Sequence, residues 1–423
     1  GVRFDRFYCA ASPCLPSRAA WFTGQYGRRN GVVSNTGCGQ EFRVRSRQRR
    51  RGDPVNGDVI RVPEMFSRHL RAGGMETVTV SNFADRHAAN WFLYGWSETH
   101  SVNLKGGRET AAEVGDAALR WLRVNARRDR WLLHVNFWDA HRCYRVDPSW
   151  ADRFRGLPGP DWPDEETISR HQALTARFSA HGQFPGHVSP FPLMPGAIRS
   201  RHDFEQAVTG YDAAIACVDH HVGLLLDELR RQGVYDDCAV IVTADHGDSF
   251  GERGVYTDHV SADECIHRIP LIVRWPGVSP GVSDALLSNI DLYPTVSEML
   301  GLATPEEVDG RSFAPLLRGG CAGPRDHLIW ECGGSYRFYM VQRAVRTERH
   351  LLIETYDRGD YPADPVELYD MCADPHQQCN LVARLTEVAA TLQARLTDWR
   401  TQMAASREAD PLEQVLRERA GGA

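Results

Sequence analysis

A cysteine near the start of the chain is followed at helical spacing by an arginine. The string from Ser12 to Arg18 reads Ser-Pro-Cys-Leu-Pro-Ser-Arg, so Cys14 and Arg18 are four residues apart. A thiol in a turn set by Pro13 and Pro16 is either a small buried packing group or a nucleophile precursor. Arg18, one helical turn beyond, would place a permanent positive charge beside that sulfur. Cys14 and Arg18 are therefore candidate catalytic residues.

A second chemical signal follows the most apolar strand-like segment of the chain, residues 239–243. Asp245 and His246 come directly after it, and open α/β sheets bind ligands at the carboxyl ends of their strands. A carboxylate and an imidazole at such a strand end can bind a divalent cation. The same residue types also form helix caps and turns, so the pair is informative only in combination with other motifs.

These motifs stand in an order that resembles the sulfatase family. Residues 14–18 are similar to the family signature C-x-P-S-R, and residues 251–277 follow the family's next long block at matching offsets. Residues 345–349 and 367–381 resemble its C-terminal pattern. Because the resemblance runs in the correct order over nearly the whole chain, it is more specific than a match to one short motif.

The resemblance implies a particular chemistry for the first two motifs. In the family the cysteine is oxidised to formylglycine by a formylglycine-generating enzyme, which would be a maturation partner of this chain. The hydrated aldehyde offers one hydroxyl to attack sulfur and another to expel sulfate. Arg18 would hold this hydrate. Asp245, His246 and the modified Cys14 would hold a divalent metal ion, with Ca²⁺ expected first and Mn²⁺ or Mg²⁺ as alternatives.

Three histidines complete the implied site. His141, in Trp-Asp-Ala-His, corresponds to the family histidine that binds sulfate and helps to protonate the leaving group. His259 stands where the family commonly has a lysine, and a histidine there can supply charge or a proton; the alternative is a surface histidine. His87 is a candidate base for the final step, against a merely structural role. Lys105 is the only lysine, so this chain cannot supply the family's two pocket lysines.

The function implied is a sulfuric ester hydrolase acting on a small-molecule or carbohydrate sulfate ester, such as a sugar, aryl or alkyl sulfate. Two alternatives stay open at this point. One is a phosphonate monoester or phosphodiester hydrolase on the same scaffold, and the other is a non-catalytic, sulfatase-like fragment or binding protein. The aromatic side chains between residues 91 and 96 could stack on a sugar ring or pack in the core.

Alternating apolar runs and helical stretches predict the α/β class. We expect strands near residues 77–80, 131–137, 239–243 and 270–275, and helices near 63–71, 109–125 and 204–231. The strand 239–243 should be central, parallel and buried on both faces. Residues 43–51, 158–195 and 305–324 are expected as loops.

The resemblance implies a large mixed, mostly parallel sheet sandwiched by helices, as in alkaline phosphatase. Residues 1–320 would form this catalytic domain, and residues 321–423 a smaller C-terminal subdomain with an antiparallel sheet and a terminal helix near 387–400. The short stretch before the signature leaves no room for the family's first strand, which carries further metal ligands. We therefore expect that strand to be missing, an apolar gap beside the Cys14 turn, and impaired metal binding and turnover.

The composition excludes several other classes of protein. A net charge of −6 over 423 residues argues against nucleic-acid binding, and no apolar run approaches the ~20 residues of a membrane span. Eleven cysteines without short metal-type spacings indicate neither a disulfide framework nor a zinc ribbon. Unpaired cysteines weakly favour a reducing, cytoplasmic compartment, but the sequence leaves the compartment and the oligomeric state undetermined.

Overall fold

The computed structural model describes residues 1–40, 63–321, 323, 325–334, 336–405 and 409–421, and the chain divides into two compact units. Unit 1 comprises Gly1–Phe66, Val240–Gly247 and His259–Ala423, and unit 2 comprises Ser67–Ala239 and Asp248–Asp258. Residues 321–423 lie within unit 1, and the division expected at residue 320 stays a prediction. The arginine-rich run 43–51 lies outside the described residues.

A mixed five-stranded sheet forms the centre of unit 1. Its strands run in the order β10–β1–β9–β6, and β11 also pairs with β1. Their bounds are β1 (Val2–Tyr8), β6 (Val240–Thr243), β9 (Arg268–Arg274), β10 (Gly281–Ser283) and β11 (Leu287–Ser288). Phe4 and Phe7 of β1 are buried with Leu271 of β9 and Phe313 in one apolar cluster. Residues Val2–Tyr8, which precede the signature, thus form an interior strand of this sheet.

The position of β6 differs from the central, parallel position that we expected for residues 239–243. It is antiparallel to β9 and lies at the end of the sheet, instead of being a parallel strand buried on both faces. Ile241 and Val242 are each 37% exposed, because β9 is the only described strand that pairs with β6. This open edge lies three residues before Asp245, near the place where the gap was expected. The absence of a preceding strand stays a prediction.

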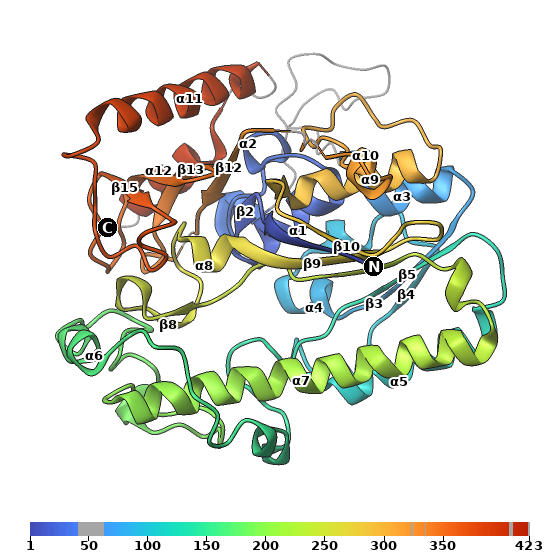
Figure 1. Cartoon of the computed structure of the whole chain (residues 1–423), viewed down its shortest axis with the longest axis horizontal. Helices are drawn as coiled ribbons and strands as arrows, with labels where there is room; N and C mark the ends of the chain where they lie inside the picture. The colour runs from blue at the N-terminus through green and yellow to red at the C-terminus, as the bar shows by residue number, and fades with distance from the viewer. Residues whose placement is uncertain (41–62, 322, 324, 335, 406–408, 422–423) are drawn as a thin grey trace. The chain divides into compact units, whose positions relative to one another are not determined.

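The C-terminal part of unit 1 contains the expected antiparallel sheet and helix (Figure 1). Leu392, Leu396 and Trp399 of the helix pack in the same cluster as Val345 and Leu352 of the sheet. The strands are β12 (His327–Cys332), β13 (Val341–Thr347), β14 (His350–Asp357) and β15 (Val366–Asp370), followed by α11 (Thr386–Ala404) and α12 (Pro411–Gly421). The short strand β2 (Ala11–Ser12) pairs in parallel with β12 and so anchors the residues just before Cys14.

The remaining helices of unit 1 are short and include the one that begins at the candidate nucleophile. They are α1 (Cys14–Thr23), α2 (Gly27–Asn30), α8 (Glu264–His267), α9 (Leu292–Met299) and α10 (Ala314–Leu317).

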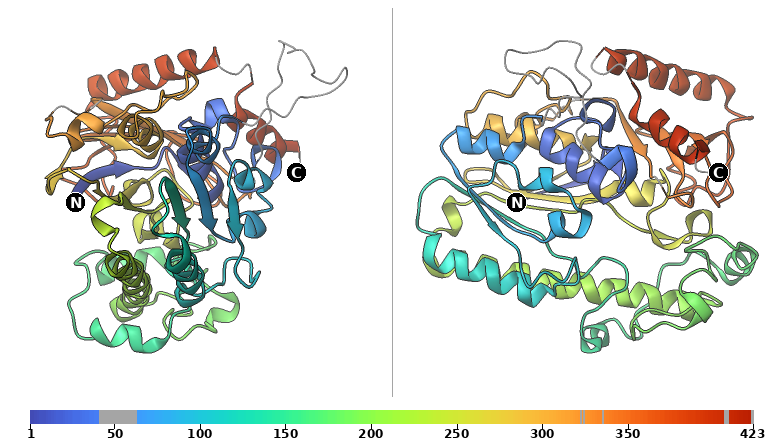
Figure 2. Two further views of the ribbon diagram at one scale, coloured as in Figure 1. Left: turned by 90° about the vertical axis from the view of Figure 1, so that its right-hand side faces the viewer. Right: turned by 180° about the vertical axis from the view of Figure 1, so that it is seen from behind.

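Unit 2 combines a three-stranded parallel sheet with two long helices that lie side by side (Figure 2). The sheet order is β4 (Glu98–His100), β3 (Glu76–Val80) and β5 (Trp131–Val135). The helices are α5 (Ala111–Asn125) and α7 (Arg201–Gln232). Thr110 and Glu113 form a capping box at the start of α5, and Gly233, with φ of 75°, ends α7.

The smaller elements of unit 2 include a helix inside the segment 158–195, which was expected to be a loop throughout. They are α3 (Phe66–Ala72), α4 (Phe83–His87), α6 (Glu165–His171), β7 (Ser249–Phe250) and β8 (Tyr256–Asp258). Asp164 caps α6 by accepting a hydrogen bond from the backbone N–H of Thr167. The high content of turn-forming residues in this segment had favoured a loop over a helix. Among the residues that the structure describes, no helix combines the length and apolarity needed to span a membrane.

Candidate active site

Cys14 is the first residue of α1 and is buried. The backbone N–H of Ser17 donates to the carbonyl of Pro13 at 3.1 Å, and the N–H of Leu15 donates to the side chain of Asn35 at 2.9 Å. Gly24 ends the helix in the left-handed region, with φ of 64°. The sequence therefore places the thiol at a helix N-terminus, where unpaired N–H groups favour negative charge.

The next two polar residues of α1 hold the end of β6. The guanidinium Nε of Arg18 donates to Asp245 Oδ2 at 2.9 Å, and the Ser17 hydroxyl donates to the backbone carbonyl of Asp245 at 2.5 Å. The backbone N–H of His246 donates to Asp245 Oδ1 at 3.1 Å. These contacts bring the signature and the Asp-His pair together, although more than 200 residues separate them in the chain.

The imidazole of His246 faces the thiol. Its Nδ1–H donates to the carbonyl of Gly247 at 2.9 Å, so its Nε2 is the nitrogen that lies 3.2 Å from Cys14 Sγ. The ring of His259 packs against it with a centroid distance of 3.9 Å and an interplanar angle of 35°. Five predicted site residues therefore lie together in unit 1: Cys14, Arg18, Asp245, His246 and His259.

Opposing charges shape the electrostatics of this cluster. Burial and the neighbouring His259 lower the pKa of His246, but Asp245 and the Cys14 thiolate outweigh them and raise it to about 9. Burial acts to raise the pKa of Asp245, but Arg18 and His246 bring it below its ordinary value. Asp245 is thus an anion held between two cations, which is the state needed of a metal ligand.

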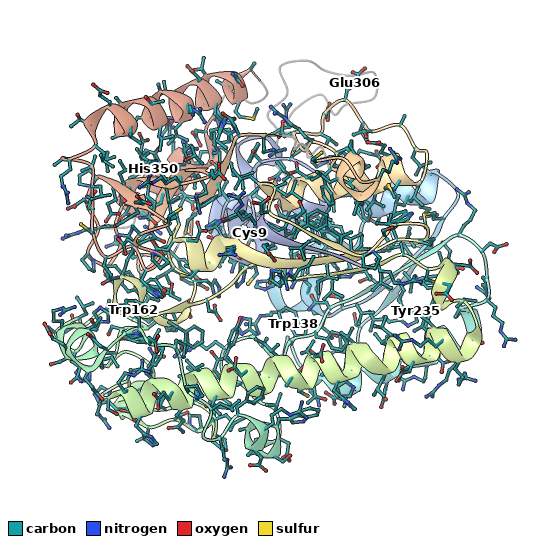
Figure 3. All side chains as sticks on the ribbon, viewed as in Figure 1. Cys9, Trp138, Trp162, Tyr235, Glu306 and His350 are labelled. Atoms are coloured by element: carbon teal, nitrogen blue, oxygen red, sulfur yellow. The ribbon has the colours of Figure 1, made fainter. Side chains whose placement is uncertain are left out.

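A buried polar network supports the turn that precedes Cys14. His267 Nδ1 donates to the carbonyl of Cys9 at 3.0 Å, and its Nε2 lies 3.2 Å from the Ser12 hydroxyl. The ring stacks on Trp330 with a centroid distance of 4.9 Å. Cys9, labelled in Figure 3, has its Sγ 3.4 Å from His267 Nδ1. Sequence reasoning missed this network because no local motif signals it.

The buried state of His267 predicts a pH dependence of folding. Burial lowers its pKa from 6.5 to about 3, so its contribution to stability is complete above pH 6.5 and is lost as the pH falls towards 3. In His267→Gln, the free energy of unfolding should depend less steeply on pH in that range, by up to about 1.4 kcal/mol per pH unit. Urea unfolding at several pH values measures this slope. The exposed His220→Gln is the control, and equal slopes in wild type and His267→Gln would contradict the prediction.

Asn289 is a further residue that the sequence did not reveal. Its Nδ2 donates to the backbone carbonyl and the hydroxyl of Ser17, both at 3.2 Å, and its Oδ1 accepts from the N–H of Ala10 at 3.0 Å. It therefore ties the start of α1 to the chain beside β2. Asn289 is 272 residues from Ser17 in sequence, and nothing in its local pattern indicates the contact.

Gly247 is required by a close approach of two backbone segments. A Cβ at this position would lie 2.2 Å from the backbone carbonyl oxygen of Cys265. Gly247→Ala should therefore displace the turn that carries His246 and reduce stability by about 1–3 kcal/mol, the usual cost of overpacking. Chemical denaturation measures the loss. Gly281→Ala, where a Cβ meets nothing within 4 Å, is the matched control and should be near neutral; equal stabilities would contradict the prediction.

The other two predicted histidines belong to unit 2. His141 Nδ1 donates to the carbonyl of Arg142 at 2.9 Å, and Arg86 Nη2 lies 3.0 Å from His141 Nε2. Since guanidinium only donates, His141 Nε2 is the acceptor in this contact. The Nε2 of His87 is buried without a hydrogen-bond partner among the described residues. The catalytic roles of His141 and His87 stay predictions.

The aromatic residues between 91 and 96 divide between the core and the surface of unit 2. Phe92 and Trp96 are buried and contact the ring of His134, so they pack in the core. Tyr94 is 40% exposed and lies beneath the guanidinium of Arg68. Among Trp91, Phe92, Tyr94 and Trp96, Tyr94 has the most exposed side chain.

The donor atoms of unit 1 fit part of a metal site. Asp245 Oδ2 and His246 Nε2 lie 3.9 Å apart, and Cys14 adjoins the same imidazole. A carboxylate, an imidazole and an oxygen derived from Cys14 would suit a divalent cation, although calcium prefers six to eight oxygens. The described residues thus supply some, but not all, ligands of a calcium shell.

Comparison with known families settles the relationship. Residues 1–302 match the family model described as Sulfatase, and residues 251–402 match the one described as N-sulphoglucosamine sulphohydrolase, C-terminal. The chain belongs to the sulfatase family. The expected enzyme class, sulfuric ester hydrolase, is therefore confirmed, whereas formylglycine, the metal and the individual site residues stay predictions.

Two curated relatives support this assignment. The chain is 30% identical over 453 residues to the N-acetylglucosamine-6-O-sulfatase of Bacteroides thetaiotaomicron, covering 91% of this chain and 76% of the relative. It is 30% identical over 212 residues to the choline-sulfatase of Rhizobium meliloti, covering 49% and 39%.

Solved structures confirm the alkaline-phosphatase-like α/β fold. One structure, of a protein in complex with its substrate D-glucosamine-2-N,6-O-disulfate, has a TM-score of 0.74 at 19% identity and covers 98% of this chain and 92% of that one. The phosphonate monoester hydrolase of Agrobacterium radiobacter has a TM-score of 0.70 at 20% identity, covering 95% and 89%. At these identities the likeness shows the fold alone.

Proposed function

We propose that this sulfatase hydrolyses a sulfate ester of a sugar, using a formylglycine derived from Cys14 and a divalent metal held by Asp245 and His246. The observation that carries the proposal is the cluster in unit 1, where Cys14 Sγ lies 3.2 Å from His246 and Arg18 holds Asp245 at 2.9 Å. When present, the modified residue would supply a hydroxyl nucleophile, and the metal would lower the pKa of that hydroxyl and offset charge on the sulfate.

The residues of unit 1 have distinct roles in this proposal. Arg18 contacts Asp245 through Nε, which leaves its terminal nitrogens to stabilise negative charge developing at position 14. His259, packed on His246, would neutralise the transferring group or give a proton to the departing oxygen. Ser17 and Asn289 position the start of α1 and the strand end that carries Asp245.

The residues of unit 2 would act on the substrate. His141 would bind sulfate and protonate the leaving oxygen, and its Nε2 lies 3.0 Å from Arg86 Nη2. Arg86 would supply positive charge beside His141. His87 is retained as the candidate base for the last step, since its buried Nε2 has no partner among described residues.

The proposed substrate class follows from the relatives. The N-acetylglucosamine-6-O-sulfatase of Bacteroides thetaiotaomicron covers most of this chain, whereas the match to choline-sulfatase covers about half of it. We therefore expect turnover of a sulfated amino sugar, such as N-acetylglucosamine-6-sulfate, to exceed that of choline sulfate. Sulfate release from the two compounds tests this order, and a preference for choline sulfate would overturn the proposed substrate.

Formylglycine is tested by mass spectrometry of the Cys14 peptide from protein co-produced with a formylglycine-generating enzyme. Conversion replaces the thiol and one hydrogen of the side chain by an aldehyde oxygen, which changes the peptide mass. An unmodified thiol in protein that hydrolyses sulfate esters would overturn the proposed nucleophile.

A second candidate activity is hydrolysis of phosphonate monoesters. It is favoured by the Asp245–His246 pair and by the structural likeness to phosphonate monoester hydrolases, with TM-scores of 0.70 and 0.67. Parallel assays with an aryl sulfate and an aryl phosphonate monoester would separate the two. We expect the sulfate to be the better substrate, and a higher kcat/KM for the phosphonate would favour the second candidate.

A further inference from the structure

We propose that the chain with an unmodified Cys14 thiol is a zinc-binding protein, with Cys14 Sγ, His246 Nε2 and one ring nitrogen of His259 as ligands. This site differs from the one proposed above in ligand set and in metal class. It does not require that Cys14 ever be oxidised, so its test is independent of formylglycine formation.

The three donor atoms lie close enough together to share one metal ion. The three donor atoms all lie within 4.8 Å of one another, and Cys14 Sγ and His246 Nε2 are 3.2 Å apart. Tetrahedral zinc, with bonds of about 2.3 Å to sulfur and 2.0–2.1 Å to nitrogen, separates such atoms by about 3.3–3.6 Å. Small side-chain rotations would therefore bring all three donors to bonding distance.

The donor set favours zinc over calcium. One thiolate and two imidazoles are soft to borderline ligands, whereas calcium and magnesium take oxygens. Three protein ligands leave the fourth position of zinc open to water.

The backbone carbonyl of Gly247 already fixes the orientation of the His246 ring. Metal-bound histidines usually donate their second ring N–H to a carboxylate or a backbone carbonyl, which fixes the ring orientation. His246 donates Nδ1–H to the carbonyl of Gly247 at 2.9 Å and directs Nε2 towards Cys14. On binding, the proton of the Cys14 thiol and any proton on the coordinating nitrogens pass to solvent, and the thiolate remains as a ligand with no change of oxidation state.

Zinc binding would have a consequence for maturation. A thiolate bound to metal is less available to reagents that attack sulfur, and therefore to any enzyme that must oxidise this side chain. In a chain that carries an oxygen function instead of the thiol at position 14, the site would lack its sulfur ligand and would prefer harder cations than zinc. The state of this one residue would thus decide which metal the site takes.

The test uses the full chain produced without a formylglycine-generating enzyme, with the thiol at Cys14 verified by peptide mass. Titration with Co²⁺, a spectroscopic substitute for zinc, should give a sulfur-to-cobalt charge-transfer band that saturates at one equivalent and disappears on addition of Zn²⁺. Cys14→Ser should abolish the band, and His259→Asn should weaken Co²⁺ affinity by at least about tenfold.

Matched controls separate this site from the other thiols and histidines. Cys379→Ser, which removes an exposed cysteine, and His220→Asn, which removes an exposed histidine of unit 2, should leave the band and the affinity unchanged. Circular dichroism establishes that each variant is folded. A wild-type protein without the band, a band unchanged in Cys14→Ser, or an unchanged affinity in His259→Asn would overturn the assignment.

A second measurement needs no variant. Zn²⁺ should slow alkylation of Cys14 by iodoacetamide, followed by peptide mass spectrometry, while the exposed Cys379 serves as the internal reference. Equal alkylation rates of Cys14 with and without Zn²⁺ would overturn the proposal.

Discussion

Cys14→Ala is expected to lower kcat for sulfate ester hydrolysis by more than about 10⁴-fold, as loss of a covalent nucleophile does in other hydrolases. The reason is that alanine carries neither a thiol to be oxidised nor a substitute donor next to His246. Release of an aryl alcohol from its sulfate, measured with matured wild type and variant, checks the loss.

The control for this variant is a second cysteine outside the cluster. Cys379→Ala removes an exposed thiol and should retain full activity. Because Cys14 is a small buried side chain at the start of α1, its truncation should leave the fold intact, which circular dichroism verifies. Wild-type turnover in a folded Cys14→Ala protein would contradict the proposed chemistry.

Arg18→Ala is expected to reduce kcat by about 10²–10³-fold, the range seen when one preorganised donor at a reacting centre is removed. The variant loses the guanidinium that contacts Asp245 Oδ2 and would face the charge developing at position 14. Arg18→Lys keeps the charge but not the planar fork, so its activity should lie between those of Arg18→Ala and wild type. Steady-state kinetics on one aryl sulfate compares the three proteins.

A similar ion pair elsewhere in unit 1 provides the control. Arg29 contacts Asp309 at 2.8 Å, whereas it is the Arg18–Asp245 pair that adjoins the cluster of Cys14 and His246. Arg29→Ala should therefore affect stability without a comparable loss of kcat. Equal kcat values for Arg18→Ala and wild type would show that Arg18 does not act in the reaction.

Some features of the fold could be predicted because they are local. The capping box at Thr110 and the glycine that ends α7 are short-range signals, and both helices were expected close to their observed bounds. The location of β6 could not be predicted in this way. Its apolar composition indicates a buried strand, but burial depends on which strands pair with it, and β9 is the only described strand that does.

The sequence by itself determined the site residues whose relationship is local. Cys14 and Arg18 are four residues apart and Asp245 precedes His246, so backbone geometry alone makes each pair neighbours. The ordered motifs also determined the family. Both results depend on spacing along the chain, which sequence records directly.

Only the tertiary structure decided how these pairs meet and what supports them. Ser17 and Asn289 are in contact across 272 residues, and His267 reaches Ser12 across 255. The close packing of His259 against His246, on which the proposed zinc site depends, is likewise absent from any local pattern. Such contacts arise when buried polar groups must find partners in a packed interior, and the chain alone does not specify which partner lies nearby.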